Sequence, residues 1–178
     1  MYDFKPGDSS DSAEHFRQLV EAAQALTEGE PDPVANMANV AALLWEFLPD
    51  LNWAGFYRIA PAKARPEAGP ETGPETGNAQ ELVLGPFVGR PACIRIPIGQ
   101  GVCGAAAASG ETQRVDDVHA FPGHIACDAA SQSELVVPVL SAGEVVAVID
   151  LDSPTAARFT DEDAKGIEAL ARMLSGRV

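Results

Sequence analysis

The sequence has few basic side chains, few cysteines and no long apolar run, and each shortage excludes a class of protein. Only 12 lysines and arginines stand against 26 acidic side chains, which gives 178 residues a formal net charge of −14. Such an acidic surface repels polyanions, so neither nucleic acid nor an anionic membrane is expected as a partner. No segment approaches the roughly 20 apolar residues of a membrane-spanning helix, and no export signal is recognisable. We expect a cytoplasmic protein that acts on small molecules or on other proteins.

The three cysteines are Cys93, Cys103 and Cys127, and no two of them form a Cys-x-x-Cys pair. An odd number of unpaired cysteines without an export signal favours reduced thiols that are reactive or bind metal. Three buried and inert cysteines are the plainer alternative. A loose metal site is another, in which Cys127, His119, His124 and a second cysteine would be the ligands.

Hydrophobic periodicity predicts two helices within residues 1–50 of a single domain. The first begins at a capping-box pattern formed by Asp11 and Glu14. The second has Asp32 as its N-cap and Pro33 at its first position. Its apolar stripe should cover a sheet, and comprises Val34, Met37, Ala41, Leu44, Trp45 and Leu48.

Further along the chain, alternating apolar residues and turn signals predict six strands, at residues 52–59, 82–87, 92–98, 112–117, 133–140 and 144–152. In the third of these, Cys93 and Arg95 should share one face, and Ile94 and Ile96 the other. A last helix is capped by Thr160. Strands joined by short turns imply a central antiparallel sheet with helices packed mainly on one face, an α+β architecture.

Two stretches between these elements differ in character. In the first strand, Trp53 and Tyr57 share a face and lie about 13 Å apart along the backbone, wide enough to line two sides of a small-ligand pocket. Ordinary core packing is the alternative for both. Residues 61–80 are rich in Pro, Gly, Glu and Thr and repeat the motif GPET. They are expected to form a flexible loop insertion without a function of its own.

Potentially reactive side chains gather in the second half of the chain. Glu134, Asp150 and Asp152 lie in or beside strands of Val, Leu and Ile. They are either solvent-facing edge residues, or they converge on a pocket, where they would bind an amino group or donate a proton. Cys103 is expected in the first turn of a short helix, where backbone N–H groups and the helix dipole can lower the pKa of a thiol.

Three runs together carry a family resemblance: GRPACIRIPIGQGVCG, TQRVDDVHAFPGHIACDAASQSELVVPV and GEVVAVIDLDSP. With NWAGFYR upstream, they resemble the free methionine-(R)-sulfoxide reductase family, whose members are built on a GAF domain. The similarity spans about residues 52–172 apart from the GPET insertion, and implies that residues 1–178 are a single GAF domain. GAF domains commonly pair through helices, so the two N-terminal helices could offer the face of a homodimer.

The resemblance implies a thiol-dependent reaction. Cys127 would attack the sulfur of free methionine sulfoxide while Asp152 or Glu134 protonates the departing oxygen, which leaves Cys127 as a sulfenic acid. Cys93 or Cys103 would then condense with it to a disulfide, which thioredoxin, or dithiothreitol in vitro, would reopen. Cys93 is favoured as the resolving cysteine because a strand residue beside the pocket is better placed than one that starts a helix.

By the same resemblance, the substrate's charged and apolar ends are held by different residues. The carboxylates of Glu134, Asp150 and Asp152 would bind its polar end, and Trp53 and Tyr57 would enclose its methyl group. Neither a metal nor a bound cofactor is implied. A GAF sensor that binds a small ligand without turnover and a thiol redox sensor are the alternatives. The absence of an output domain from this chain favours the enzyme.

Overall fold

The computed structural model describes residues 12–63, 79–123 and 129–178. Its elements, in chain order, are α1 (Ser12–Thr27), α2 (Pro33–Phe47), β1 (Trp53–Pro61), β2 (Gln80–Gly89), β3 (Arg95–Pro97), α3 (Gly101–Ser109), β4 (Gln113–Val115), a 3-10 turn (Val118–Ala120), β5 (Ser133–Ser141), β6 (Glu144–Ser153) and α4 (Asp161–Met173). Every predicted helix and strand is present, although β3 and β4 are shorter than expected.

The strands form one sheet in the order β3-β2-β1-β6-β5-β4, and all neighbouring pairs are antiparallel. The predicted hairpin between β5 and β6 turns through Ala142 and Gly143, which both have positive φ, at 52° and 86°. Two consecutive positive φ values match the right-handed twist of the flanking strands. The α+β architecture predicted from the sequence is confirmed.

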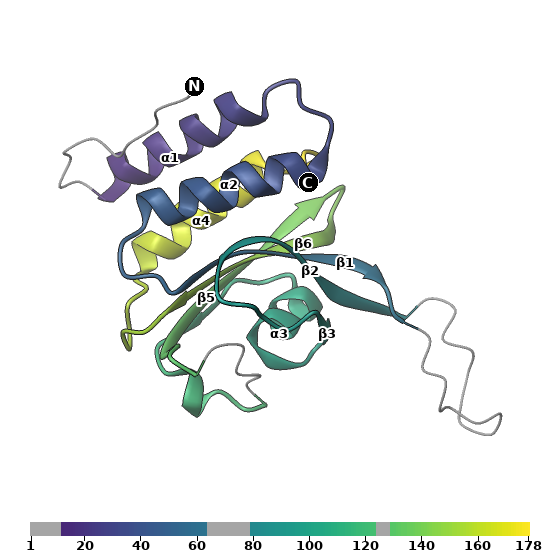
Figure 1. Ribbon diagram of the computed structural model, residues 1–178, viewed down its shortest axis with the longest axis vertical. Helices are drawn as coiled ribbons and strands as arrows, with labels where there is room; N and C mark the ends of the chain where they lie inside the picture. The colour runs from purple at the N-terminus through teal and green to yellow at the C-terminus, as the bar shows by residue number, and fades with distance from the viewer. Residues whose placement is uncertain (1–11, 64–78, 124–128) are drawn as a thin grey trace.

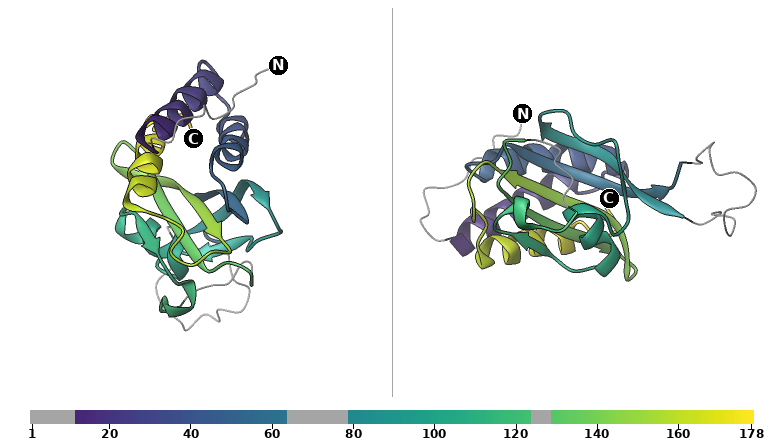
Figure 2. Two further views of the ribbon diagram at one scale, coloured as in Figure 1. Left: turned by 90° about the vertical axis from the view of Figure 1, so that its left-hand side faces the viewer. Right: turned by 90° about the horizontal axis from the view of Figure 1, so that it is seen from below.

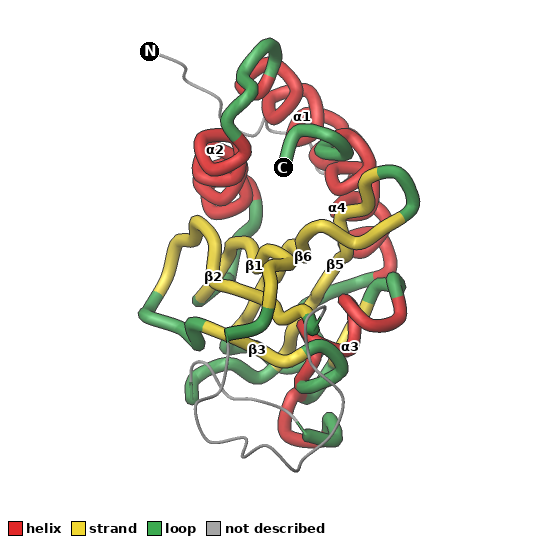
Figure 3. The backbone as a smooth tube through the Cα atoms, turned by 90° about the vertical axis from the view of Figure 1, so that its right-hand side faces the viewer, coloured by secondary structure: helices red, strands yellow, loops and turns green. Residues whose placement is uncertain are grey.

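Helices cover the two faces of this sheet unequally (Figures 1 and 3). On the face that we call the helix face, α2 packs against β1 and β2, α4 packs against β5, and α1 lies against α2 and α4. The short helix α3 lies on the opposite face, which we call the site face. The apolar core between the sheet and the three longer helices is fully buried at Leu19, Met37, Leu44, Phe56, Ile149 and Ile167.

Local signals in the sequence account for where two of these helices begin. The Asp32 side chain accepts hydrogen bonds from the backbone N–H groups of Val34 and Ala35 at the start of α2. At α4, the Thr160 hydroxyl and the Asp163 carboxylate form the reciprocal bonds of a capping box. These caps were predicted and are confirmed; the cap expected at Asp11 lies outside the described residues.

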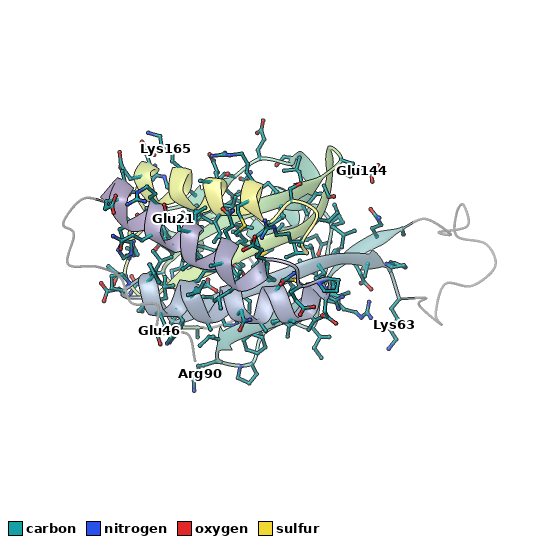
Figure 4. All side chains as sticks on the ribbon, turned by 90° about the horizontal axis from the view of Figure 1, so that it is seen from above. Glu21, Glu46, Lys63, Arg90, Glu144 and Lys165 are labelled. Carbon is teal, nitrogen blue, oxygen red and sulfur yellow. The ribbon has the colours of Figure 1, made fainter. Side chains whose placement is uncertain are left out.

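The predicted stripe of α2 was wrong at two positions. Val34 and Trp45 are 48% and 40% exposed, whereas Val40 and Phe47, which were not expected in the stripe, are buried. The buried side of the helix is therefore rotated away from Val34 and Trp45, toward Val40 and Phe47. Seen from above, exposed charged side chains such as Glu21, Glu46 and Lys165 lie along the outer side of the helical layer (Figure 4).

The strand predicted at residues 92–98 was also wrong in its extent. Only Arg95–Pro97 pair with β2, and Cys93 lies in the connection before them. Ile94 is 69% exposed and Ile96 is 3% exposed, so these two side chains do not share a face. Pro91 has no N–H group and cannot donate to a ladder, which helps to explain why pairing starts late.

The Pro/Gly-rich insertion joins two strands that extend beyond the body of the sheet. β1 runs to Pro61 and β2 starts at Gln80, so the ends of the predicted loop are paired strand (Figure 2). Residues 64–78 lie outside the described part of the chain. Among the described helices, none combines the length and the apolar character that crossing a membrane requires.

Candidate active site

Strand register brings the predicted site residues together on the site face. Trp53 and Gly55 of β1 lie opposite Asp152 and Asp150 of β6, and Asp152 is in turn opposite Glu134 of β5. Because side chains alternate along a strand, partners in register project from the same face of a sheet. The predicted carboxyl groups of β5 and β6 therefore converge on one face of the sheet, next to β1 with its aromatic residues.

We call Glu134, Asp150 and Asp152 the acid cluster. Their exposed fractions are only 6%, 5% and 7%, so the interpretation of these acids as solvent-facing edge residues is excluded. The Cys103 thiol approaches the cluster, with its Sγ 3.9 Å from Oε1 of Glu134. The side-chain ligand atoms of Cys103, Glu134 and Asp150 all lie within 4.8 Å of one another.

Burial and mutual repulsion set the charge of the acid cluster. Burial raises the pKa of Glu134 well above its ordinary range, and the neighbouring carboxylates of Asp150 and Asp152 raise it further. Burial also raises the pKa of Asp150, to about 6. A buried carboxyl that sits among other acids keeps its proton to a higher pH than a free carboxyl does. The cluster can therefore supply both a proton donor and a negative charge.

The environment of Cys103 differs from the expectation. The residue lies in the first turn of α3, as predicted, but is only 4% exposed. Burial raises the pKa of its thiol, and the nearby charges of Asp150 and Glu134 add to this effect. The predicted lowering by the helix N-terminus was wrong, because desolvation and two acids outweigh the helix dipole. Cys103 is a protonated thiol and a weak nucleophile.

One carboxyl oxygen of the cluster lacks a partner. Asp150 Oδ1 is buried and has no hydrogen bond to a described residue. A buried acceptor without a partner is costly, and a cation or a donor group would relieve that cost. Cys103, Glu134 and Asp150 have the spacing and chemistry to hold a divalent cation, and the same oxygens suit an ammonium group.

The aromatic residues form one wall of the site. The rings of Trp53 and Tyr57 stack at a centroid distance of 5.8 Å, and Trp53 stacks on Phe87 at 5.2 Å. The expectation that Trp53 and Tyr57 line two separate sides of a pocket was therefore wrong. Their side chains lean toward each other and, with Phe87, make a continuous apolar surface beside the acid cluster.

Sequence analysis missed Phe87 and Gly55 as parts of this site. A Cβ atom added to Gly55 would lie 2.4 Å from Cβ of Phe87, so only glycine fits between the aromatic wall and β2. Alternation in the run WAGFY places Gly55 on the same face as the two aromatic residues. That pattern was a usable signal, whereas the contribution of Phe87 depends on cross-strand register.

The remaining predicted residues are two cysteines and two histidines, and the structure describes only some of them. Cys93 is half-buried, and its side chain packs against the apolar cluster that contains Trp53 and Tyr57. Cys127, the predicted nucleophile, and His124 lie outside the described residues. His119 lies exposed in the 3-10 turn.

Comparison with known proteins places this site in a family. The GAF domain model matches residues 16–178. The free methionine-R-sulfoxide reductase of Escherichia coli is 45% identical over 161 residues, which cover 90% of this chain and 87% of that protein. The chain belongs to the free methionine-R-sulfoxide reductase family of GAF domains. The resemblance inferred from the sequence is confirmed.

Two further comparisons show similarity over most of the chain. Protein YtsP of Bacillus subtilis is 48% identical over 166 residues, which cover 93% of this chain and 92% of that protein. A free methionine-R-sulfoxide reductase from Neisseria meningitidis, solved by X-ray analysis in complex with its substrate, superposes with a TM-score of 0.84. It is 40% identical, and the match covers 99% of this chain and 95% of that one. The family fold is therefore present over nearly the whole chain.

Proposed function

We propose that this protein reduces free L-methionine-(R)-sulfoxide to L-methionine, with thiols as the source of electrons. The observation that carries the proposal is the buried acid cluster beside a wall of stacked aromatic rings, in a chain 45% identical to a reductase of that name. The relatives support the substrate, and the geometry of the site face supports how it is bound.

The two halves of the site match the two ends of the substrate. Free methionine sulfoxide carries an ammonium group and a polar sulfoxide oxygen, and it ends in an apolar methyl group. Asp150 and Asp152 supply carboxylates for the ammonium group, and the orphan Oδ1 of Asp150 gains a donor on binding. Trp53 and Tyr57 enclose the methyl group, for which an aromatic surface is a favourable neighbour.

The first chemical step transfers oxygen from the substrate to a cysteine. The sulfur of Cys127 attacks the sulfoxide sulfur, and the sulfoxide oxygen accepts a proton. The protonated oxygen then moves to the sulfur of Cys127: a bond between that oxygen and the Cys127 sulfur forms, and the bonds from the substrate sulfur to the oxygen and to Cys127 break. Methionine leaves, and Cys127 becomes a sulfenic acid. Cysteine is oxidised by two electrons and the sulfoxide is reduced by two, so the step balances without a cofactor.

Glu134 is the proton donor in this proposal. Its pKa is raised well above the ordinary range by burial and by two neighbouring acids, so it keeps its proton to a higher pH than an ordinary glutamic acid. General acids work best when their pKa lies near the working pH. This assignment chooses between the two candidates, Asp152 and Glu134, that the sequence left open.

A second cysteine completes the cycle. Its thiol attacks the sulfenic acid of Cys127, a disulfide forms and water leaves; thioredoxin then reduces the disulfide by thiol exchange. We assign this role to Cys93 because Cys103 is buried and its thiol pKa is raised. Cys93→Ser should therefore slow thioredoxin-dependent turnover far more than Cys103→Ser, and equal effects would contradict the assignment.

Methionine release from the pure R and S epimers, with dithiothreitol as reductant, tests the proposed function. The wild-type protein should release methionine from the R epimer only, and Cys127→Ser should release none. Absence of release from either epimer would contradict the proposal and favour a GAF domain that binds a ligand without turnover. Release by Cys127→Ser at the wild-type rate would show that another group is the nucleophile.

A further inference from the structure

The segment that carries Cys93 is held to the sheet by the aromatic wall of the site. This segment connects β2 to β3. The hydroxyl of Tyr57 donates a hydrogen bond to the backbone carbonyl of Cys93 at 3.0 Å, and Nε1 of Trp53 donates one to the carbonyl of Arg90 at 3.2 Å. Ladder pairing between β2 and β3 starts at Arg95, preceded by one backbone bond from the Leu84 N–H to the Ile94 carbonyl at 3.0 Å. Two side-chain bonds thus help to fix the backbone before β3.

Both donors are rigid. Tyr57 is fully buried and Trp53 is 2% exposed, and their rings stack on each other. A hydroxyl fixed by ring packing holds its acceptor in one place at little further cost in entropy. Cys93 itself lies outside the helices and the paired part of β3, and the nearest backbone bond from β2 reaches the next residue, where the Leu84 N–H donates to the Ile94 carbonyl at 3.0 Å. The Tyr57 bond acts on Cys93 directly, and the position of this residue matters most for resolution.

We infer that Tyr57 is the positioning residue of the resolving cysteine, because its hydroxyl holds the Cys93 backbone beside the aromatic wall of the site. The inference rests on the proposed function, in which Cys93 attacks the sulfenic acid of Cys127. That condensation forms a sulfur–sulfur bond and releases water, so the Cys93 thiol must reach its partner. Fixing one reactant raises its effective concentration at the other.

Tyr57→Phe separates the two roles of the residue. Phenylalanine keeps the ring that stacks on Trp53 and removes only the hydroxyl. Without its donor, the Cys93 segment should sample more positions, so disulfide formation after one turnover should slow about three- to tenfold, as expected for the loss of one hydrogen bond. Methionine formation in the first turnover should fall by a smaller factor than disulfide formation.

The measurement mixes reduced protein with the R epimer and no reductant, and quenches with N-ethylmaleimide at intervals. Mass spectrometry counts remaining thiols, and chromatography counts methionine. Hydrogen exchange of the peptide that spans residues 90–95 gives a readout independent of chemistry, and should rise in Tyr57→Phe. Disulfide formation and hydrogen exchange that both match the wild type would overturn the inference.

Two controls separate positioning from general damage. Thr112→Val removes a hydroxyl that bonds Oε1 of Glu168 at 2.7 Å, outside the site, and should leave disulfide formation at the wild-type rate. In a Cys93→Ser background, adding Tyr57→Phe should slow thioredoxin-dependent turnover by no more than it slows first-turnover methionine formation; a larger loss there would contradict the inference. A wild-type protein that forms no methionine would instead disprove the proposed function.

Discussion

Both faces of the sheet bury apolar side chains, and on β5 and β6 the site face buries carboxyl groups as well. On β6, Ala147, Ile149 and Leu151 point to the helix face, and the residues between and after them, Val148, Asp150 and Asp152, point to the site face. Burying an apolar side chain stabilises a fold by roughly 1.5 to 3 kcal/mol, whereas burying a carboxylate costs free energy unless the charge is paired or neutralised. One strand thus carries both the core and the chemistry.

The difference shows what the helical layer does. Three helices complete an apolar core on one side of the sheet, which holds three acids and a thiol on its other side. Neutral substitutions in the acid cluster should therefore alter activity without lowering stability. Changes on the helix face should lower stability and leave the chemistry of folded molecules intact. Neighbouring residues on one strand provide matched pairs for this comparison.

The largest effect is expected for Glu134→Gln on the site face. Glutamine has nearly the same shape and cannot donate a proton as an acid does, so the first-turnover rate of methionine formation should fall about 10²- to 10⁴-fold. Urea unfolding should show no loss of stability, because a buried acid is replaced by a neutral group. A first-turnover rate within tenfold of the wild type would remove Glu134 from the proton-donor role.

Leu135→Ala is the matched change on the helix face. Leu135 is fully buried in the core beneath the helices, so its truncation should lower the free energy of unfolding by about 2 to 5 kcal/mol. Methionine release per folded molecule should stay within a few-fold of the wild type. Urea denaturation followed by tryptophan fluorescence measures the first quantity. A large loss of activity in fully folded protein would show that the two faces are coupled.

Asp150→Asn tests how much the buried charge of Asp150 lowers the stability of the fold. The pKa of Asp150 is raised from 3.8 to about 6, so the folded state binds its proton more tightly than the unfolded state does. The contribution of Asp150 to the stability of the wild type is therefore most favourable below about pH 4. As the pH rises through 6, this contribution to the free energy of unfolding falls by on the order of 2 to 3 kcal/mol. The variant should lack this loss. Stability curves of equal slope between pH 4 and pH 8 would contradict this account.

The smallest effect is expected at a helix cap remote from the acids. Thr160→Ala removes the hydroxyl that accepts from the Asp163 backbone N–H in the capping box of α4. Loss of an N-cap costs about 1 kcal/mol, which lowers Tm by about 2 to 4 °C in a chain of this size. Calorimetry measures the shift, and activity at 25 °C should not change. An unchanged Tm would show that the Thr160 cap does not contribute to the stability of α4.

Much of the fold could be predicted because local signals agree with it. The cap at Asp32, the capping box at Thr160 and the alternation of β6 each determine an element without reference to the rest of the chain. Strand alternation also identified Asp150 and Asp152 as residues of one face, and the family resemblance linked them to Glu134. Their burial could not be derived, because it depends on which strands pair.

The errors arose where tertiary contacts override local pattern. Trp45 continues the apolar pattern of α2, yet the helix packs through the side that carries Val40 and Phe47, which leaves the Trp45 side chain 40% exposed. The helix start at Cys103 was correct, but the effect on its thiol was wrong because the acids come from β5 and β6. The bond from Tyr57 to the Cys93 carbonyl joins segments far apart in the sequence, and no local signal shows it.

The most direct test of the account is to count the methionine formed and the thiols lost per chain when no reductant is present. Fully reduced protein is mixed with excess R epimer, and methionine and free thiols are counted after the reaction stops. The account predicts one methionine formed and two thiols lost per chain, with neither change when the S epimer is used. Absence of methionine, or methionine formed with all three thiols intact, would contradict it.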